Sequence, residues 1–423
     1  MSAPSALPSG LRTSALLLLL LAYIFNFLDR QIVSILQIPL KAELRLSDTQ
    51  LGLLGGTAFA ILYSTLAIPL AHVADRRGRL KVVAAGVAVW SLFTAVCGLT
   101  RGFGQLFVAR VGVGVGEAAG VAPSYAFLSQ AFPPSSRARA LAVFSLGIPL
   151  GSGLGIFLGG WIAQAFSWRV AFIVIGLAGL PVAAALWLLD RRIQRGASAA
   201  PAGPRFAATA AELLAKPSFW LLAFGAASAS ICGYGYGQWL PRMIHDIHGT
   251  DLKQLGAYFG SIVVIGGSAG ILLGGLLGDR FGRGRPGAYA AIPAIAFVAT
   301  VPLYFMAFYT PSLSGAWIWF ALPYMLSLMW LGPIVAAVQG LVAPAARASA
   351  SAMFLLVNNL IGIGVGPLIF GIASDRLTPD HGREGLRLAL VYGLGFYVLA
   401  AILCGLAALR LSRDTRVGDS EPH

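Results

Sequence analysis

Charged residues are scarce in this sequence. Only 11% of its 423 residues are Asp, Glu, Lys or Arg, whereas 57% are hydrophobic. Soluble domains carry roughly 25% charged residues, because their surfaces face water. The composition therefore argues against a soluble protein. Many windows of about 18 or more residues are nearly uncharged and predict transmembrane helices. These apolar stretches are continuous rather than alternating, which argues against a membrane β-barrel.

Cysteine and histidine are also scarce, with three and five residues. Cys97, Cys232 and Cys404 lie far apart in apolar segments, so they form no disulfide or metal pattern. His245 and His248 form an isolated pair in an expected loop, and we interpret them as solvated. We expect no metal and no cofactor. No set of nucleophile, base and metal indicates an enzyme.

Acidic residues are fewer than basic residues, with 16 Asp and Glu against 30 Lys and Arg, so the net charge is +14. In a soluble protein this excess would indicate nucleic acid binding. In a membrane protein the positive-inside rule explains it better, so we expect no nucleic acid partner. With both termini in the cytoplasm, basic residues favour the inner side by about two to one. Abundant Arg, Ala and Gly with little Lys indicate GC-rich bacterial coding, and hence the bacterial inner membrane.

Breaks at Pro, Gly and charge clusters divide the chain into twelve predicted spans. The first begins with a leucine run that resembles a signal peptide, but no small-residue cleavage site follows, so we interpret it as a retained helix. The predicted spans are 14–38, 50–73, 81–100, 103–128, 138–164, 168–189, 217–240, 253–278, 287–309, 314–341, 348–374 and 386–410.

A long polar segment follows the sixth span and predicts two six-helix halves, at 1–189 and 217–410. The cytoplasmic linker would be 190–216 and the cytoplasmic tail 411–423. Motifs repeat between the halves, since "AHVADRRGR" after span 2 matches "GLLGDRFGR" after span 8. Duplicated halves are typical of secondary transporters.

The repeated loop has the pattern G-x-x-x-D-R-x-G-R, with Ala71 in place of the first glycine in copy one. It resembles the signature of the major facilitator superfamily, which implies that superfamily's fold of twelve helices in two pseudo-symmetric halves. We interpret the loop as a latch of the outward-open state; the alternative is charge that only sets topology. The latch residues are Asp75, Arg76, Gly78, Arg79, Gly275, Asp279, Arg280, Gly282 and Arg283.

The first span carries polar residues on one broad face, because helical residues are spaced by about 100°. They are Tyr23, Asn26, Asp29, Arg30 and Gln37. Charges near mid-membrane cost several kcal/mol and normally face a cavity. Asp29 and Arg30 are therefore candidates for function; the alternative is a structural ion pair between helices.

The fourth span contains "RVGVGVGEAAG", residues 110–120. Its Gly114, Gly116 and Ala119 fit a dinucleotide pattern, but that motif needs a strand before it, which a membrane span lacks. Arg110 and Glu117 are seven residues apart, so they share a helix face and are separated by about 10 Å along the helix axis. The glycines at 112, 116 and 120 lie roughly opposite and allow another helix to approach closely.

Several stretches narrow the resemblance to the Spinster family of this superfamily. They are "NFLDR" (26–30), residues 47–76, residues 90–118, "FP" (132–133), "GQWLPRMI" (237–244) and residues 358–376. Members of that family move lysolipids and sphingoid phosphates, and several are proton-coupled. The resemblance implies proton coupling at Asp29 and Glu117, and headgroup binding at Arg30, Arg110 and Asn26.

Polar residues in other spans are cavity candidates or helix-joining groups, and the sequence leaves both interpretations open. They are Tyr23, Tyr234, Tyr236, Gln238, Asn358 and Asn359. The glycine-rich "GIPLGSGLGIFLGG" (147–160) resembles an exporter motif of the superfamily but lacks that motif's Gly-Pro pair. The alternative is close packing against a neighbouring helix.

Our leading hypothesis is a monomeric, proton-coupled transporter that moves an amphiphilic lipid, a lysophospholipid, by rocking of its halves within the lipid bilayer. A transporter of a small organic anion or a drug is the main alternative. A channel would need a continuous polar pathway, and the spans offer few polar positions.

Overall fold

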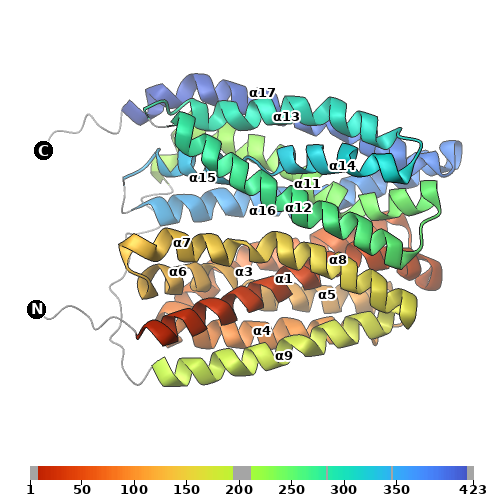
Figure 1. Cartoon of the computed structure of the whole chain (residues 1–423), viewed down its shortest axis with the longest axis horizontal. Coiled ribbons are helices and arrows are strands. Elements are labelled where there is room, and N and C mark those ends of the chain that lie inside the picture. The colour runs from red at the N-terminus through yellow and green to blue at the C-terminus, as the bar shows by residue number, and fades with distance from the viewer. Residues whose placement is uncertain (1–7, 194–210, 283, 344–345, 417–423) are drawn as a thin grey trace, which may run out of the picture. The chain divides into compact units, whose positions relative to one another are not determined.

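The computed structural model of the protein describes residues 8–193, 211–282, 284–343 and 346–416. These residues form helices and contain no strand. Twelve stretches are long and apolar enough to cross a membrane, which confirms the predicted number of spans. The protein is therefore an all-α, multi-pass membrane protein (Figure 1).

The chain divides into two compact units. Unit 1 comprises Met1–Pro201 and Thr250–Gly260, and unit 2 comprises Ala202–Gly249 and Ser261–His423. The start of the eighth predicted span thus packs with unit 1. Residues 194–210 of the predicted linker and 417–423 of the predicted tail lie outside the described residues, and the predicted domain boundaries stay predictions.

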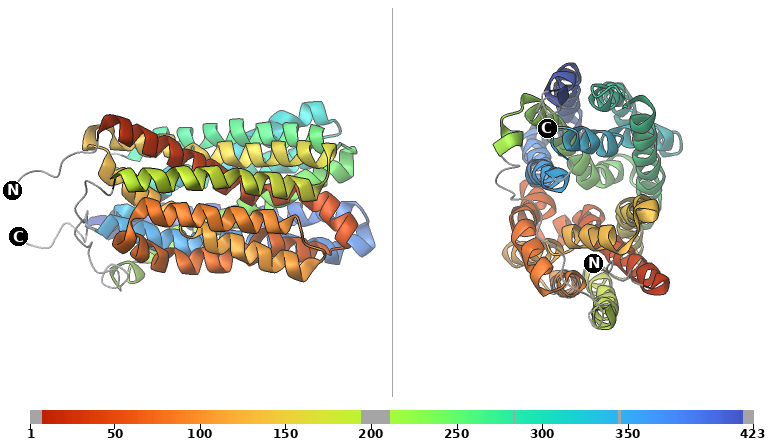
Figure 2. Two further views of the ribbon diagram at one scale, coloured as in Figure 1. Left: turned by 90° about the horizontal axis from the view of Figure 1, so that it is seen from below. Right: turned by 90° about the vertical axis from the view of Figure 1, so that its left-hand side faces the viewer.

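Unit 1 is a bundle of helices whose long axes run in nearly the same direction (Figure 2). Its helices are α1 (Ser9–Leu44), α2 (Asp48–Gly52), the π-helix η1 (Leu53–Thr57), α3 (Ala58–Arg77), α4 (Arg79–Cys97), α5 (Phe103–Glu117), α6 (Val121–Ala131), α7 (Pro134–Ser145), α8 (Gly147–Ala165) and α9 (Trp168–Ile193).

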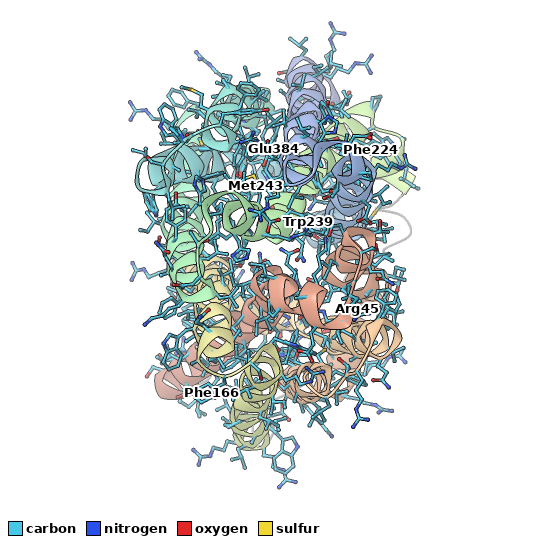
Figure 3. The ribbon with its side chains drawn as sticks, turned by 90° about the vertical axis from the view of Figure 1, so that its right-hand side faces the viewer. Arg45, Phe166, Phe224, Trp239, Met243 and Glu384 are labelled. Carbon is cyan, nitrogen blue, oxygen red and sulfur yellow. The ribbon has the colours of Figure 1, made fainter. Side chains whose placement is uncertain are left out.

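Helix α1 packs closely against α8 along the predicted glycine-rich segment. A Cβ atom at Gly155 would lie 2.6 Å from the carbonyl oxygen of Leu28, and one at Gly159 would lie 2.8 Å from Ile32 Cγ1. Close packing therefore explains this glycine row. Figure 3 shows Arg45 and Phe166, just beyond the ends of α1 and α8, at the same end of the unit.

Unit 2 contains the other long helices, including most of α12. They are α11 (Pro217–His248), α12 (Leu252–Gly282), α13 (Ala288–Phe308), α14 (Leu313–Ser327), α15 (Leu331–Gln339), α16 (Arg347–His381) and α17 (Glu384–Arg416). Helix α11 packs against α16 and α17, and α13 packs against α14 and α17. Their buried faces form the core of this unit.

Local sequence signals explain several helix ends. Ser47 begins α2 with a capping box, because its hydroxyl accepts the Gln50 amide N–H at 3.1 Å and the Gln50 side chain accepts the Ser47 N–H at 3.0 Å. Gly78 turns the chain between α3 and α4 at φ 99°, which favours a residue without a Cβ.

The sequence led us to expect one continuous helix for the fourth span, and this expectation is wrong. The span breaks at residues 118–120, so Glu117 ends α5 rather than lying within an unbroken helix. The break precedes Pro123, whose missing N–H cannot bond the carbonyl four residues earlier. The tenth span repeats this arrangement, with a break at residues 328–330 before Pro333.

Candidate functional site

The four charged candidates of the first and fourth spans are all buried inside unit 1. Arg110 and Glu117 are 0% exposed, Asp29 is 1% exposed and Arg30 is 6% exposed. Helix α1 supplies Asp29 and Arg30, and α5 supplies Arg110 and Glu117. The structure thus brings together the residues that the sequence singled out from two separate spans.

Arg30 and Glu117 form the ion pair of the site. The guanidinium Nη2 atom donates to Glu117 Oε2 at 2.8 Å, and it also lies 3.5 Å from Asn26 Oδ1. The sequence had left open which charges would pair. This geometry joins α1 to the end of α5, immediately before the break in the fourth span.

Aromatic rings surround the Arg30 guanidinium. Its central carbon lies 4.8 Å from the ring centre of Phe27, 4.4 Å from that of Phe59 and 4.8 Å from that of Tyr63. Cations are attracted to the faces of aromatic rings, more strongly when water is absent. The rings therefore stabilise a buried positive charge beside the Glu117 carboxylate.

Arg110 has a different environment from Arg30. Its Nη1 donates to the backbone carbonyl of Asp29 at 3.3 Å, and its Nε donates to that of Leu54 at 3.5 Å. Leu54 lies in η1, the π-helical turn of span 2. π-helical turns occur frequently at functional sites. Two main-chain oxygens therefore hold the Arg110 guanidinium, which forms no ion pair within 4.0 Å among the described residues.

Asp29 faces α4 rather than Arg30. Its Oδ2 accepts a hydrogen bond from the Thr94 hydroxyl at 3.1 Å. Thr94 is fully buried and carries no sequence signal that distinguishes it from other span threonines. It is therefore a contact of the site that sequence reasoning missed, together with the aromatic residue Phe59.

The glycine row of the fourth span faces α4, as predicted. A Cβ at Gly112 would overlap the Phe93 ring, and one at Gly116 would lie 2.8 Å from Trp90 Cβ. A Cβ at Gly120 would lie 3.5 Å from the Trp90 ring. These close contacts confirm helix packing on that side. They leave the other side of α5 for Arg110 and Glu117.

The chemical capacity of this charge cluster follows from its balance. Two carboxylates and two guanidinium groups sum to zero when all are ionised. Because buried charges are costly unless compensated, uptake of one proton leaves an excess positive charge that favours an anion. The cluster can therefore link a proton to an anionic ligand.

The polar candidates of unit 2 lie on α11 and α16. Ser230 Oγ donates to Asn358 Oδ1 at 2.8 Å, and Asn358 Nδ2 lies 3.5 Å from Asn359 Oδ1. Gln238 is 5% exposed, and Tyr234 is half-buried. The Ser230–Asn358 bond joins α11 to α16, so this asparagine has a helix-joining contact.

Tyr236 lies in an aromatic cluster of unit 2. Its hydroxyl donates to the Leu390 carbonyl at 2.8 Å, and its ring lies 4.9 Å from that of Tyr304 and 6.0 Å from that of Tyr397. One turn further on, Trp239 Nε1 donates to the Pro367 carbonyl at 2.8 Å (Figure 3). Packing within the unit accounts for these contacts of Tyr236.

The two copies of the latch motif have different contacts. In the first, Arg79 pairs with Asp75 at 2.7 Å and donates to the Ala126 carbonyl at 3.2 Å. Arg76 is exposed at the end of α3. The first copy therefore joins α3 and α4 to α6.

In the second copy, Arg280 lies 5.9 Å from the Phe281 ring, and Asp279 is exposed. A Cβ at Gly282 would overlap the Tyr289 ring, whereas Gly275 faces open space. Arg283 lies outside the described residues. The latch role stays a prediction for both copies.

Metal-ligating side chains do not gather in the described part of the chain: no three or more of its His, Cys, Asp and Glu residues could hold one ion. The three cysteines are buried and form no disulfide. The expectations of no metal and no cofactor stay predictions.

Comparison with known proteins gives the family. Residues 19–367 match the model of the Major Facilitator Superfamily. The chain belongs to this superfamily. An MFS-type efflux pump of Mycolicibacterium smegmatis is 35% identical over 391 residues, which cover 92% of this chain and 91% of the pump. A probable L-galactonate transporter of Escherichia coli is 27% identical over 65% of this chain and 63% of that protein.

A solved structure of a bacterial homologue of the human lysosomal transporter Spinster, inward-facing and unoccupied, has a TM-score of 0.86 to this chain. It is 29% identical and the match covers 96% of this chain and 99% of that chain. The resemblance to Spinster-like members of the superfamily is therefore confirmed. Superfamily members are carriers in general, and the comparisons indicate no catalytic family.

Proposed function

We propose that the protein is a secondary transporter that couples the movement of an amphiphilic, anionic lipid, a lysophospholipid, to protons by alternating access. The observation that carries this proposal is the buried charge cluster of unit 1, with the Arg30–Glu117 pair at 2.8 Å. Such intramembrane charges are costly to bury and mark substrate or proton pathways in transporters.

Arg30 and Arg110 attract the phosphate of the substrate. Arg110 suits this role because backbone carbonyls position its guanidinium, and no carboxylate competes for it within 4.0 Å among the described residues. Guanidinium groups match phosphate oxygens in shape and charge. Asn26, beside Arg30, donates or accepts a further hydrogen bond at the headgroup.

Asp29 and Glu117 carry the protons. When substrate leaves, its negative charge leaves with it, and the ionised arginines then hold both carboxylates in their charged forms. When Glu117 takes up a proton, Arg30 loses its partner and is released toward an anion. This exchange of partners links the proton to the substrate.

A transporter of a small organic anion or a drug is the second candidate. The efflux pump and the probable L-galactonate transporter among the relatives favour it. The same arginines would bind a carboxylate in place of a phosphate. The carboxylate is planar and the phosphate tetrahedral, but guanidinium groups form paired hydrogen bonds with the oxygens of both.

Transport by the purified protein in lipid vesicles tests these proposals. Labelled lysophospholipid and labelled galactonate are offered in parallel, each with and without a pH gradient. We expect lysophospholipid to move faster with the gradient, and Glu117→Gln to remove that acceleration. Movement of galactonate alone would favour the second candidate, and equal rates with and without the gradient would refute proton coupling.

The remaining expectations concern the cell. We propose a monomer in the bacterial inner membrane, surrounded by membrane lipids, with both termini in the cytoplasm. The charge bias of the loops supports this orientation. A cysteine placed before α1 and a thiol reagent that does not cross membranes test this orientation, in intact and in broken cells. Labelling of intact cells would show that the N-terminus lies outside, which would contradict the proposed orientation.

A further inference from the structure

A small pocket in unit 1 lies beside the ion pair, toward the end where α1 begins. Its walls come from α1, α4, α6 and α7, together with Gly120 of the break in the fourth span. The volume is about 10 Å³, which is about the space that the centre of one water molecule needs. The pocket therefore admits water and excludes a larger ligand.

Trp90 supplies a hydrogen-bond donor in the wall of this pocket. The residue is 1% exposed, and its indole N–H donates to none of the described residues. Buried tryptophans usually find a partner for this N–H, because an unsatisfied donor costs free energy. Close contacts with Gly116 and Gly120 fix the indole ring against the break.

Asn26 and Ser124 also line the pocket. Asn26 Oδ1 lies 3.5 Å from Arg30 Nη2, the same atom that donates to Glu117 Oε2 at 2.8 Å. Asn26 therefore lies between the pocket and the ion pair. Ser124 donates its hydroxyl hydrogen to the Gly120 carbonyl at 2.6 Å, so its oxygen is left as an acceptor.

These groups have the complementarity that a buried water needs, namely two or more polar partners around a volume of its own size. The water oxygen accepts from the Trp90 indole N–H. It also accepts from Asn26 Nδ2, which has no hydrogen-bond partner among the described residues. One water hydrogen is directed at the Ser124 oxygen, and the other is left for transfer toward Glu117. Since Glu117 Oε2 faces Arg30, Oε1 is the oxygen that remains for a proton.

We propose that this pocket binds one water molecule and that this water transfers protons to and from Glu117. The proposal rests on the proton coupling proposed above. In the transfer, one O–H bond of the water breaks as one forms on Glu117 Oε1. The water regains a proton from hydronium when alternating access opens the pocket to the aqueous phase, and it is then unchanged.

The other charges near Glu117 are consistent with this role. They are Arg30 and Asp29 of α1 and Arg110 of its own helix. The residues of α4 and α6 that line the pocket are uncharged. No fixed charge in the lining of the pocket therefore competes for the proton that the water carries.

Trp90→Phe tests the proposal, because it keeps an aromatic ring and removes the indole N–H. Trp161→Phe is the matched control, since Trp161 is 45% exposed on α8 and lines no part of the pocket. In a high-resolution density map of the unaltered protein, we expect a water peak about 3 Å from Trp90 Nε1. We expect no such peak in Trp90→Phe.

Proton flux into vesicles provides the second measurement. Substrate-driven proton uptake should slow about fivefold in Trp90→Phe, the effect of losing one ordinary hydrogen bond, and stay unchanged in Trp161→Phe. Exchange of labelled for unlabelled substrate, which moves no net protons, should be the same in all three proteins.

The outcomes separate this proposal from the proposed function. Without a water peak in the unaltered protein, the water site is wrong whatever is transported. With a peak but equal proton flux in Trp90→Phe, the transfer role is wrong. If the unaltered protein moves substrate without protons, proton coupling itself fails, and the density alone then decides whether the water site exists.

Discussion

The interiors of the two units differ in charge. Unit 1 buries two carboxylates and two guanidinium groups among α1 and α5, whereas the polar residues that unit 2 buries among its described residues are uncharged at neutral pH. Unit 2 fills its core with an aromatic cluster instead, centred on Tyr236, Tyr304 and Tyr397. The two units thus have differently composed cores, one with buried charges and one with buried aromatic side chains.

This difference indicates a division of labour. A buried ion pair stabilises a fold only weakly, because desolvation offsets much of the attraction between the charges. Unit 2 forms a comparable bundle with neutral residues, so the charges of unit 1 are not needed for the fold. This comparison supports the role proposed for the charge cluster in transport.

The largest effect is expected from breaking the ion pair with Arg30→Met. Glu117 would then be buried beside an apolar side chain, and removal of one partner of a buried pair costs about 3–5 kcal/mol. We expect a strongly lowered unfolding temperature in detergent at neutral pH, and no transport.

The double variant Arg30→Met/Glu117→Gln is the control for this experiment. Because it removes both charges, it should recover most of the thermal stability and none of the transport. Recovery of transport in the double variant would contradict a functional role for the charges of unit 1. An unfolding temperature of Arg30→Met equal to that of the unaltered protein would contradict the expected cost of an unpaired buried charge.

The next largest effect is the loss of coupling between substrate transport and the pH gradient. We expect Asp29→Asn to remove this coupling while leaving transport itself intact. An asparagine keeps an oxygen for the Thr94 hydroxyl but takes up no proton. We therefore expect transport that continues along the substrate gradient but no longer responds to a pH gradient. Asp246→Asn in unit 2, which alters a carboxylate paired with Arg242 at 3.3 Å, should retain the response. An equal loss in both variants would remove the distinction between the units.

A moderate effect is expected in unit 2 from Tyr236→Phe. The change removes the hydrogen bond that the hydroxyl donates to the Leu390 carbonyl, and an ordinary bond of this kind contributes about 0.5–1.5 kcal/mol. Thermal stability should fall while the pH response of transport stays intact. Tyr392→Phe, at a tyrosine 67% exposed, is the control and should change neither. A lost pH response in Tyr236→Phe would place proton chemistry in unit 2 as well.

Much of the fold was predictable because membrane spans have strong compositional signals. Twelve apolar stretches, the polar face of the first span and the glycine row of the fourth were all evident in the sequence. These patterns can be recognised in the sequence without knowing which helices are neighbours. Burial in lipid and contact between helices each constrain residues at a fixed spacing along the chain.

The pairing within the site was not predictable in this way. Which carboxylate meets Arg30 depends on how α1 lies against α5, and the two residues are 87 positions apart. Thr94 and Phe59 were missed because a threonine or a phenylalanine in an apolar span has no distinguishing signal. The break in the fourth span had one, since Pro123 and its counterpart Pro333 occupy the same place after each break.

The smallest effect should separate the two copies of the latch motif. Arg79→Gln removes the contacts with Asp75 and the Ala126 carbonyl, whereas Arg280→Gln removes a ring contact at 5.9 Å. An exposed ion pair contributes about 0.2–1 kcal/mol, and one hydrogen bond adds about 1 kcal/mol. Arg79→Gln should therefore lower thermal stability slightly more than Arg280→Gln. Equal losses would mean that the contacts of Arg79 contribute nothing beyond those of its counterpart, and the asymmetry between the units would then be confined to their buried cores.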